Sequence, residues 1–393
     1  MILTPLLGYA LLVLAVTVVL LGIVLVNLAI LPTPGPGPRA RDGRVAVLVP
    51  ARDEEMNIEA CVRGLLAQDY PDMEIWVFDD ASTDRTGEIA ERLAGEPRDD
   101  GPVLYVVRGS GDPPPGWMGK PYACHRLYNA MRERSCPEYV LFTDADVRFE
   151  PEAVSAAVDI AVRERSGLLS IFPRQEIGSW GERLVVPLMM HWTGFTLLPL
   201  PTAHAVRTGP AFAAANGQFM LFTREAYEAC DGHRAVRDSI LEDVVLARAV
   251  KRAKHRTILA DTGPLLHTRM YRSAGEVWRG YSKNAFAFFG YSSVLLVLGA
   301  AALLALYVFP PVLAVWAFLA GEAAAAWAFA GAYGAAVAAR IALSVRFSYP
   351  VLDSLLHPVG MLCLVAIMFN SMVWGLTGRG AWKGRTIART DSA

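Results

Sequence analysis

Two aspartates, Asp144 and Asp146, end an apolar run in the stretch VLFTDADV. Side chains two residues apart in an extended segment point the same way, so we expect both carboxylates to face one crevice. Mg²⁺ and Mn²⁺ prefer oxygen ligands and are usually held by one or two carboxylates together with phosphate oxygens. This pattern suits the loss of a nucleoside diphosphate, because a cation stabilises the charge that grows on the leaving group.

Acidic clusters also follow two earlier apolar runs. Arg52, Asp53 and Glu54 come after RVAVLVPA, and Asp79 and Asp80 come after MEIWVF. Ligands of parallel sheets bind at the carboxyl ends of the strands, where such clusters meet. A turn or a helix cap explains any one cluster by itself. Three clusters on one edge favour a ligand site.

The elements that must position these acids alternate along the chain. Short Val-rich runs begin at residues 44, 73, 103 and 139, and the first two lead into segments with a helical period of apolar residues. Asn57 is the expected N-cap of the first of these helices. Strands that alternate with helices predict an α/β fold with a mostly parallel, doubly wound sheet.

A candidate general base lies further along, in SILEDVVLARAVKRA. Glu242 and Asp243 begin an amphipathic helix, where the helix N-terminus is expected to stabilise the ionised form. Asp243 is the preferred base for taking a proton from an acceptor hydroxyl. The alternative is that both acids only complement the helix dipole.

Composition excludes several classes of function. The net charge of −1 gives no basic field for nucleic acid. The chain has neither the G-x-G-x-x-G fingerprint of dinucleotide sites nor a P-loop. Its five cysteines form no C-x-x-C pair, which argues against a disulfide framework or a zinc site and fits a reducing compartment.

Long uncharged stretches predict a membrane part. Residues 2–31 carry no charge, and about twenty apolar residues suffice to cross a bilayer. We interpret this stretch as an anchor and not a cleaved signal peptide. A Pro/Gly linker with Arg39, Arg41 and Arg44 follows, which indicates the cytoplasmic side.

Three further apolar segments lie between residue 284 and the basic C-terminal tail. With the first anchor they would place that tail opposite the catalytic domain, against the positive-inside rule. One C-terminal segment is therefore expected to be re-entrant or interfacial. The predicted organisation is an anchor (1–31), a linker (32–44), a catalytic domain (45–260), a basic juxtamembrane segment (261–286), C-terminal transmembrane helices (287–378) and a cytoplasmic tail (379–393).

The order and spacing of the motifs resemble a known family. VAVLVPARDEEMNI, VFDDASTDRTGEIA, FTDADVRFEP and LEDVVLARAV resemble the family 2 glycosyltransferases with the GT-A fold, over roughly residues 45–250. GWMGKPYACH, GLLSIFP, DGH, RMYRSAGEVWRGYSKN and WKGR further resemble the membrane-bound enzymes that glucosylate apocarotenoid acids of the diaponeurosporenoate type. Lipid glycosyltransferases, including those of hopanoid pathways, share part of this pattern.

The resemblance assigns roles by position. Catalytic residues would be Asp243 and Glu242, and the metal ligands Asp146 and Asp144, with Asp146 as the direct ligand. Nucleotide-sugar-binding residues would be Pro50, Ala51, Arg52, Glu54, Asp79, Asp80, Lys120, Asp144, Arg279 and Lys283. Lys120 is expected on a loop, either touching the diphosphate or solvated. Candidate acceptor-site residues are Trp117, Gly217, Gln218 and His233.

The expected activity is inverting transfer of a hexose from a nucleotide-sugar, UDP-glucose first, with Mg²⁺ or Mn²⁺ as cofactor. The acceptor would be a carotenoid or apocarotenoid acid at the cytoplasmic face of the cell membrane. Alternatives are a hopanoid, glycerolipid or polyprenyl-phosphate acceptor, or a non-catalytic scaffold that binds nucleotide-sugars. The chain lacks the Q-x-x-R-W motif of processive polysaccharide synthases and reads GEVWRGYSKN instead, which argues against a polymerase.

Overall fold

A computed structural model describes residues 5–35, 42–98, 100–378, 381–382 and 385–386. The chain divides into two compact units. Among the described residues, one unit contains the helices within 5–30, 177–199 and 271–378, and the other contains residues from 31–176 and 200–270. Arg39, Arg41 and most of the predicted tail lie outside the described residues.

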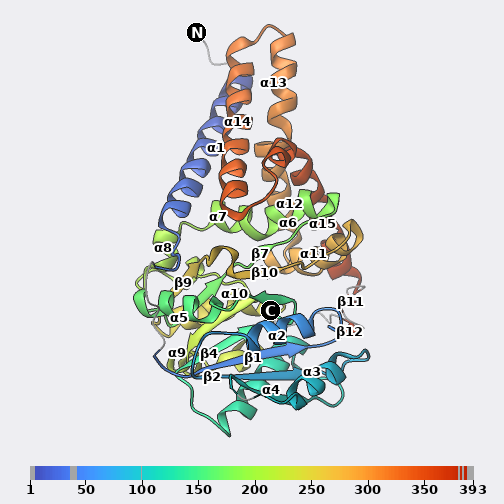
Figure 1. Cartoon of the computed structure of the whole chain (residues 1–393). Helices are drawn as coiled ribbons and strands as arrows, with labels where there is room; N and C mark the ends of the chain where they lie inside the picture. Colours follow the sequence, from blue (N-terminus) through green and yellow to red (C-terminus); the bar gives the residue numbers. More distant parts are fainter. Residues whose placement is uncertain (1–4, 36–41, 99, 379–380, 383–384, 387–393) are drawn as a thin grey trace. The chain divides into compact units, whose positions relative to one another are not determined.

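The second unit is built on a seven-stranded sheet (Figure 1). Its strands, in spatial order, are β3 (Val103–Arg108), β2 (Met73–Asp79), β1 (Val45–Ala51), β4 (Tyr139–Thr143), β8 (Phe219–Thr223), β6 (Leu168–Ile171) and β9 (Thr257–Ala260). β3, β2, β1 and β4 are parallel, β8 is antiparallel to both neighbours, and β6 and β9 are parallel. The prediction of a mostly parallel α/β sheet is confirmed.

Helices cover both faces of this sheet because its strands are apolar on both sides. In β1, Val45, Val47 and Val49 join one core with α2 (Ile58–Leu66), α3 (Thr86–Gly95) and α5 (Ala153–Arg163). The alternate residues Ala46 and Leu48 join a second core. That core includes α4 (Gly119–Arg132), α9 (Arg224–Ala229) and α10 (Glu242–Arg252).

Smaller elements complete this unit. A second sheet has the order β5 (Val147–Phe149), β10 (Leu266–Thr268) and β7 (Arg174–Gln175), and short helices are α8 (Leu200–His204), η2 (Pro210–Phe212), η3 (Gly232–Val236) and η4 (Gly263–Leu265). The predicted N-cap Asn57 precedes α2, but its side chain makes no cap bond and donates to Glu54 Oε2 at 2.8 Å instead. The predicted N-cap position of Asn57 is confirmed, without a capping bond from its side chain.

The helical unit contains four segments long and apolar enough to cross a membrane: Pro5–Ile30, Ser293–Leu319, Ala323–Phe347 and Val351–Thr377. Its elements are α1 (Pro5–Ile30), α6 (Trp180–Pro187), η1 (Leu188–Trp192), α7 (Thr193–Leu197), α11 (Ala274–Phe288), α12 (Ser293–Leu303), η5 (Leu304–Val308), α13 (Phe309–Leu319), α14 (Ala323–Phe347), η6 (Val351–Leu356) and α15 (His357–Thr377). A two-stranded hairpin, β11 (Ala381–Trp382) with β12 (Arg385–Thr386), follows.

α1 and α14 run in the same direction. Near their N-terminal ends, Tyr9 packs its ring edge against Phe329 at 5.4 Å, and Ala10 packs in one cluster with Ala325. Ala317, at the end of α13, joins the same cluster. The α12–α13 helix therefore runs antiparallel to α14, and its first residue lies toward the C-terminal end of α14.

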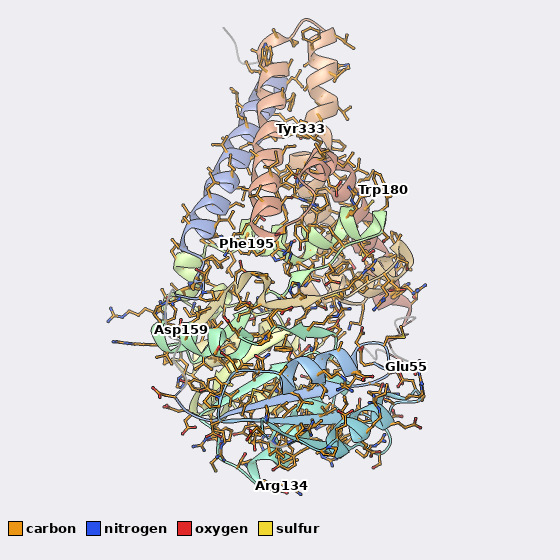
Figure 2. The ribbon with its side chains drawn as sticks, in the orientation of Figure 1. Glu55, Arg134, Asp159, Trp180, Phe195 and Tyr333 are labelled. Atoms are coloured by element: carbon orange, nitrogen blue, oxygen red, sulfur yellow. The ribbon has the colours of Figure 1, made fainter. Side chains whose placement is uncertain are left out.

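The chain turns back on itself after α14. Ser354 Oγ lies 3.3 Å from Ser344 Oγ near the end of α14. The carbonyl of the next residue, Leu355, accepts a 2.8 Å hydrogen bond from Tyr333 Oη. Tyr333, labelled in Figure 2, is about three turns earlier in α14 than Ser344. η6 therefore runs back toward the N-terminal end of α14 before α15 begins. α15 then descends to α11, where Ser371 Oγ accepts from the N–H of Phe286 at 2.8 Å.

Candidate active site

The loops that follow β1 and β2 are fastened to each other. The N–H of Asp80 donates to the carbonyl of Ala51 at 2.8 Å, and Arg52 Nη1 donates to the carbonyl of Asp80 at 2.7 Å. Glu54 N–H donates to Thr86 Oγ1 at 2.7 Å. These bonds hold the predicted nucleotide-binding loop, Pro50 to Glu54, at the carboxyl edge of the sheet.

Asp79 is committed to a structural role at this edge. Its carboxylate is buried, forms a 2.5 Å ion pair with Arg108 and accepts the N–H of Ser82 at 3.1 Å. Asp80, also buried, is consequently the stronger of the two candidates for contact with a base or ribose.

The two aspartates after β4 lie in a turn. β4 ends at Thr143, and the N–H of Val147 donates to the carbonyl of Asp144 at 3.3 Å. The expectation that an extended backbone aligns Asp144 and Asp146 was therefore wrong, because the strand stops before the first of them. β5 begins at Val147, so the pair forms the connection between the two sheets.

Carboxylates from the first and last acidic clusters do converge. The Cys61 thiol of α2 is buried, and burial together with the negative charges of Asp146, Glu54 and Asp144 raises its pKa well above the ordinary value. The Cys61 thiol thus lies near three carboxylates from two loops, the one after β1 and the one after β4. The sequence-based expectation that these acids meet at one edge agrees with this arrangement.

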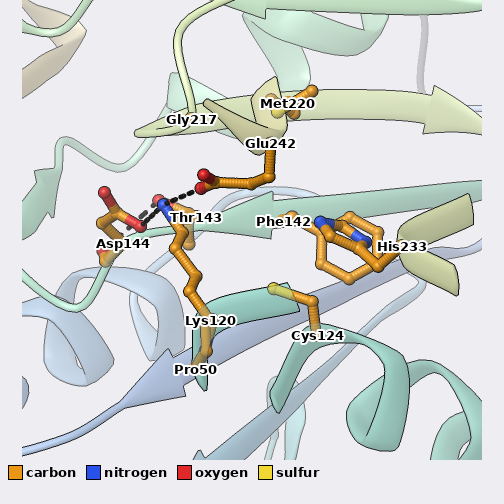
Figure 3. Close-up of a pocket in the computed structure, with 10 residues that line it drawn as sticks. All are labelled: Pro50, Lys120, Cys124, Phe142, Thr143, Asp144, Gly217, Met220, His233 and Glu242. Carbon is orange, nitrogen blue, oxygen red and sulfur yellow. Dashed lines mark hydrogen bonds and ion pairs between the residues drawn. The ribbon is translucent and has the colours of Figure 1, made fainter. Parts of the chain in front are cut away.

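Lys120 links two of the predicted site acids (Figure 3). Its Nζ lies 2.6 Å from Asp144 Oδ1 and 3.1 Å from Glu242 Oε1. Burial alone would lower the pKa of Lys120, but Asp144 and Glu242 outweigh it and raise that pKa well above its ordinary value. Lys120 lies in the first turn of α4, so its expected place on a loop was wrong.

Glu242 and Asp243 begin α10, as the sequence predicts. Asp243 Oδ2 accepts the N–H of Gly217 at 2.9 Å, and Oδ1 accepts the N–H of Val244 at 2.8 Å. Burial and the neighbouring charge of Glu242 nevertheless raise the pKa of Asp243 to about 6, against the opposing effect of Lys120 and these bonds. The Val244 N–H at the helix N-terminus favours the ionised form, as expected, but burial outweighs it.

A small pocket opens between these acids and the sheet (Figure 3). Its wall includes four residues already predicted beside Asp144 and Glu242: Pro50, Lys120, Gly217 and His233. A Cβ on Gly217 would lie 3.1 Å from Lys120 Nζ, so another residue here would displace the ammonium by a few tenths of an ångström. His233 is buried, bonds Tyr227 Oη through Nδ1 at 2.9 Å and has its pKa lowered by burial to about 3, which keeps it neutral.

The sequence reasoning missed four pocket residues: Cys124, Phe142, Thr143 and Met220. Phe142 and Thr143 immediately precede the acidic pair, and that position was a usable signal. Met220 could not be found from sequence, because it reaches the pocket through the antiparallel pairing of β8 with β4.

The remaining candidates lie outside this pocket wall. Gln218 is buried, and its Oε1 accepts from Gln175 Nε2 at 3.0 Å, which indicates a structural role. Trp117 packs against His125 with ring centroids 4.9 Å apart. Arg279 and Lys283 lie in α11 of the helical unit, so their contact with a diphosphate stays a prediction.

The carboxylates fit a divalent cation in a particular way. Among the described residues, no group of three or more His, Cys, Asp or Glu side chains is arranged to hold a metal by itself. Mg²⁺ and Mn²⁺ are commonly bound by one or two carboxylates plus substrate phosphates. The pair Asp144 and Asp146 therefore fits an ion whose remaining ligands come from a bound diphosphate.

Known proteins share this fold and sequence. A mannosyltransferase from Pyrobaculum calidifontis, solved in complex with GDP-Man and Mn²⁺, superposes with a TM-score of 0.55 and 22% identity over 94% of this chain and 99% of its own. The 4,4'-diaponeurosporenoate glycosyltransferase of Staphylococcus haemolyticus is 25% identical over 61% of this chain and 60% of its own length. A beta-monoglucosyldiacylglycerol synthase of Nostoc is 26% identical over 48% of this chain and 37% of its own length.

The sheet and the structural likeness define a GT-A α/β fold. The model of the glycosyl transferase family 2 matches residues 46–230. The protein therefore carries a family 2 glycosyltransferase domain, which confirms the resemblance drawn from the motifs.

Proposed function

We propose that this protein transfers a hexose from a nucleotide-sugar, UDP-glucose first, to a lipophilic acid such as an apocarotenoid acid. The observation that carries the proposal is the ion-paired set Asp144, Lys120 and Glu242 at the carboxyl edge of the sheet in a family 2 domain. The likeness to a diaponeurosporenoate glycosyltransferase supports the acceptor. Because only 60% of that enzyme is matched, its acceptor enters here only as part of the proposal.

Each group has a role in the proposed reaction. Asp144 and Asp146 would hold Mg²⁺ or Mn²⁺, which when bound supplies positive charge against the departing diphosphate. Lys120 would turn from Asp144 to the phosphate oxygens as the donor enters. Pro50 to Glu54 and Asp80 would bind the nucleoside. Asp243, held by Gly217, would orient the acceptor oxygen for attack on the anomeric carbon from the opposite face.

Incubating purified protein with UDP-glucose, Mn²⁺ and an apocarotenoid acid tests the proposal directly. Mass spectrometry should find the acid with one added hexose, released by mild alkali as an ester would be. Hexose on a diacylglycerol, and none on the acid, would instead favour the second candidate, a glycerolipid acceptor. The likeness to a monoglucosyldiacylglycerol synthase supports that candidate. Absence of any transfer, with UDP still bound, would favour a binding scaffold.

The dependence of kcat/KM on pH should distinguish the two acceptor classes. A hydroxyl needs a base, and Asp243, with its pKa of about 6, accepts a proton only when ionised, so the rate would rise with pH through 6. An acid acceptor is already ionised above about pH 5 and needs no base. We therefore expect kcat/KM not to rise through pH 6, and Asp243→Asn to lose less activity than Asp146→Asn. A rise that disappears in Asp243→Asn would contradict an acid acceptor.

The chain path supports a membrane topology with three crossings. In this topology α1, the α12–α13 helix and α14 would cross, whereas η6 and α15 would enter and leave on the side where α14 ends; the contacts among these helices support it. Arg44 and the basic residues after Thr377 would then share the cytoplasmic side, as the positive-inside rule prefers. Three crossings would avoid the conflict that four crossings create.

Green fluorescent protein fused after Ala393 checks this topology, because it becomes fluorescent in the cytoplasm and not when exported unfolded. We expect strong fluorescence, together with alkaline phosphatase activity when the phosphatase is inserted after Gly321 between α13 and α14. A dark C-terminal fusion that is expressed at full length would indicate a fourth crossing.

A further inference from the structure

Arg340 carries a charge inside the helical unit that its neighbours do not neutralise. It lies in α14, one of the apolar segments, and is 3% exposed. Within the described part of the chain, its Nε and Nη1 have no hydrogen-bond acceptor, and Nη2 reaches only the carbonyl of Arg183 at 3.4 Å. A buried ionisable residue inside an apolar membrane segment usually marks a functional site.

The carboxylate of Asp353 is already paired with another arginine. Asp353 of η6 forms a two-point ion pair with Arg183 of α6, with Oδ2 2.7 Å from Nε and Oδ1 2.5 Å from Nη2. No ion pair joins Asp353 to Arg340 within the described residues. The cluster of Arg183, Arg340 and Asp353 therefore holds two guanidinium groups and one carboxylate, an excess of one positive charge.

The first residue of α15 adds an unpartnered imidazole ring beside this cluster. His357 is 1% exposed, and neither ring nitrogen has a partner in the described part of the structure. Its ring packs on Trp192 at 4.3 Å and on Tyr307 at 5.1 Å. Arg340 lies on the face of α14 that carries Tyr333 and Ser344, and these two residues contact Leu355 and Ser354, just before His357.

We propose that Arg340 and His357 bind the anionic group of a lipid, a carboxylate or a phosphate. The unused donors of Arg340 suit either group, because hydrogen bonds from a guanidinium to an anionic oxygen are charge-assisted and strong. The outer side of η6 is apolar and exposed at Leu352 (79%) and Leu355 (55%), as a surface against acyl chains would be. This site is separate from the donor site and does not depend on which sugar is transferred.

The competing explanation is a purely structural arginine, and its consequences differ. A structural Arg340 would stabilise the fold through its contacts, so its removal should lower the melting temperature. An unneutralised buried charge instead costs stability, and an apolar replacement of similar size is neutral or stabilising. The bound anion would offset that cost in the wild-type protein.

Thermal unfolding of the full chain in a neutral detergent tests the proposal. The added probes are oleic acid, phosphatidic acid, the uncharged methyl oleate and diacylglycerol, and inorganic phosphate. We expect at least one anionic lipid to raise Tm by about 4 °C or more near saturation, and the uncharged pair to leave it unchanged. A response to oleic acid alone assigns a carboxylate, and a response to phosphatidic acid alone assigns a lipid phosphate. A response to inorganic phosphate alone would overturn the lipid assignment.

Matched variants complete the test. Arg340→Met should keep the Tm of the lipid-free wild type and lose the rise in Tm with anionic lipid. Arg340→Lys should keep a smaller rise. Arg346→Met, in the last turn of the same helix, should respond to the lipid like the wild type. A lipid-free Arg340→Met protein that melts several degrees lower, beside a wild type that ignores every anionic lipid, would overturn the proposal. Binding of UDP with Mn²⁺ to the same samples separates this outcome from a failure of the proposed transferase function.

Discussion

Asp144→Asn and Asp146→Asn should each lower kcat by at least about 10²-fold, the scale of losing one group that stabilises transition-state charge. The amide keeps the shape of the side chain but removes the negative charge that a divalent cation requires. Asp144 lines the pocket, and Asp146 acts with it and Glu54 on the Cys61 thiol, so both belong to the converging acids. Initial rates of sugar transfer at saturating UDP-glucose and Mn²⁺ provide the measurement.

Glu133→Gln is the matched control, because Glu133 is an exposed acid at the end of α4. It should keep wild-type kcat. Equal activity of Asp144→Asn, Asp146→Asn and the control would remove these aspartates from the reaction. Circular dichroism should show all three variants folded, since Asp144 is about a third exposed and its change leaves no buried charge unpaired in the sheet core.

Lys120→Met should change metal and donor binding in opposite directions. In the absence of donor the ammonium occupies Asp144 Oδ1 at 2.6 Å, so a cation must displace it. Its removal should tighten Mn²⁺ binding by about tenfold, the equivalent of one charge-assisted hydrogen bond. The diphosphate then loses its ammonium partner, and kcat/KM for UDP-glucose should fall by about 10²-fold. Mn²⁺ electron paramagnetic resonance and steady-state kinetics measure the two effects.

Lys120→Arg and Arg132→Met serve as controls for charge and for helix composition. Lys120→Arg keeps the positive charge, so its Mn²⁺ affinity and its kcat/KM should stay closer to wild type than those of Lys120→Met. Arg132→Met changes an exposed residue in the last turn of α4 and should alter neither Mn²⁺ affinity nor kcat/KM. Weaker Mn²⁺ binding in Lys120→Met would mean that the lysine supports the metal site and does not compete with it.

Much of the catalytic unit was predictable because its signals are local. The Val-rich strands, the helices after them and the acids at their carboxyl ends each occupy one short stretch, such as β1 with Arg52 and Glu54. The start of α10 at Glu242 and Asp243 was readable for the same reason.

Features that depend on distant partners were not predictable. The turn at Asp144 follows from where β4 stops, and the contact of Lys120 with Glu242 joins residues far apart in sequence. The raised pKa of Asp243 comes from burial, which outweighs the local effect of the helix end. In the helical unit, the positive-inside rule predicted one re-entrant or interfacial segment, but the sequence could not identify which one, because the return of η6 along α14 depends on the Tyr333–Leu355 bond.

The central claim is that Asp144 and Asp146 bind a nucleotide diphosphate through a divalent cation. Isothermal titration of UDP into the purified protein, with Mn²⁺ and then with EDTA, tests it most directly. We expect UDP to bind at least about tenfold more tightly with Mn²⁺, and the two Asp→Asn variants to lose that difference. Equal UDP affinity with Mn²⁺ and with EDTA in the wild-type protein would contradict the account.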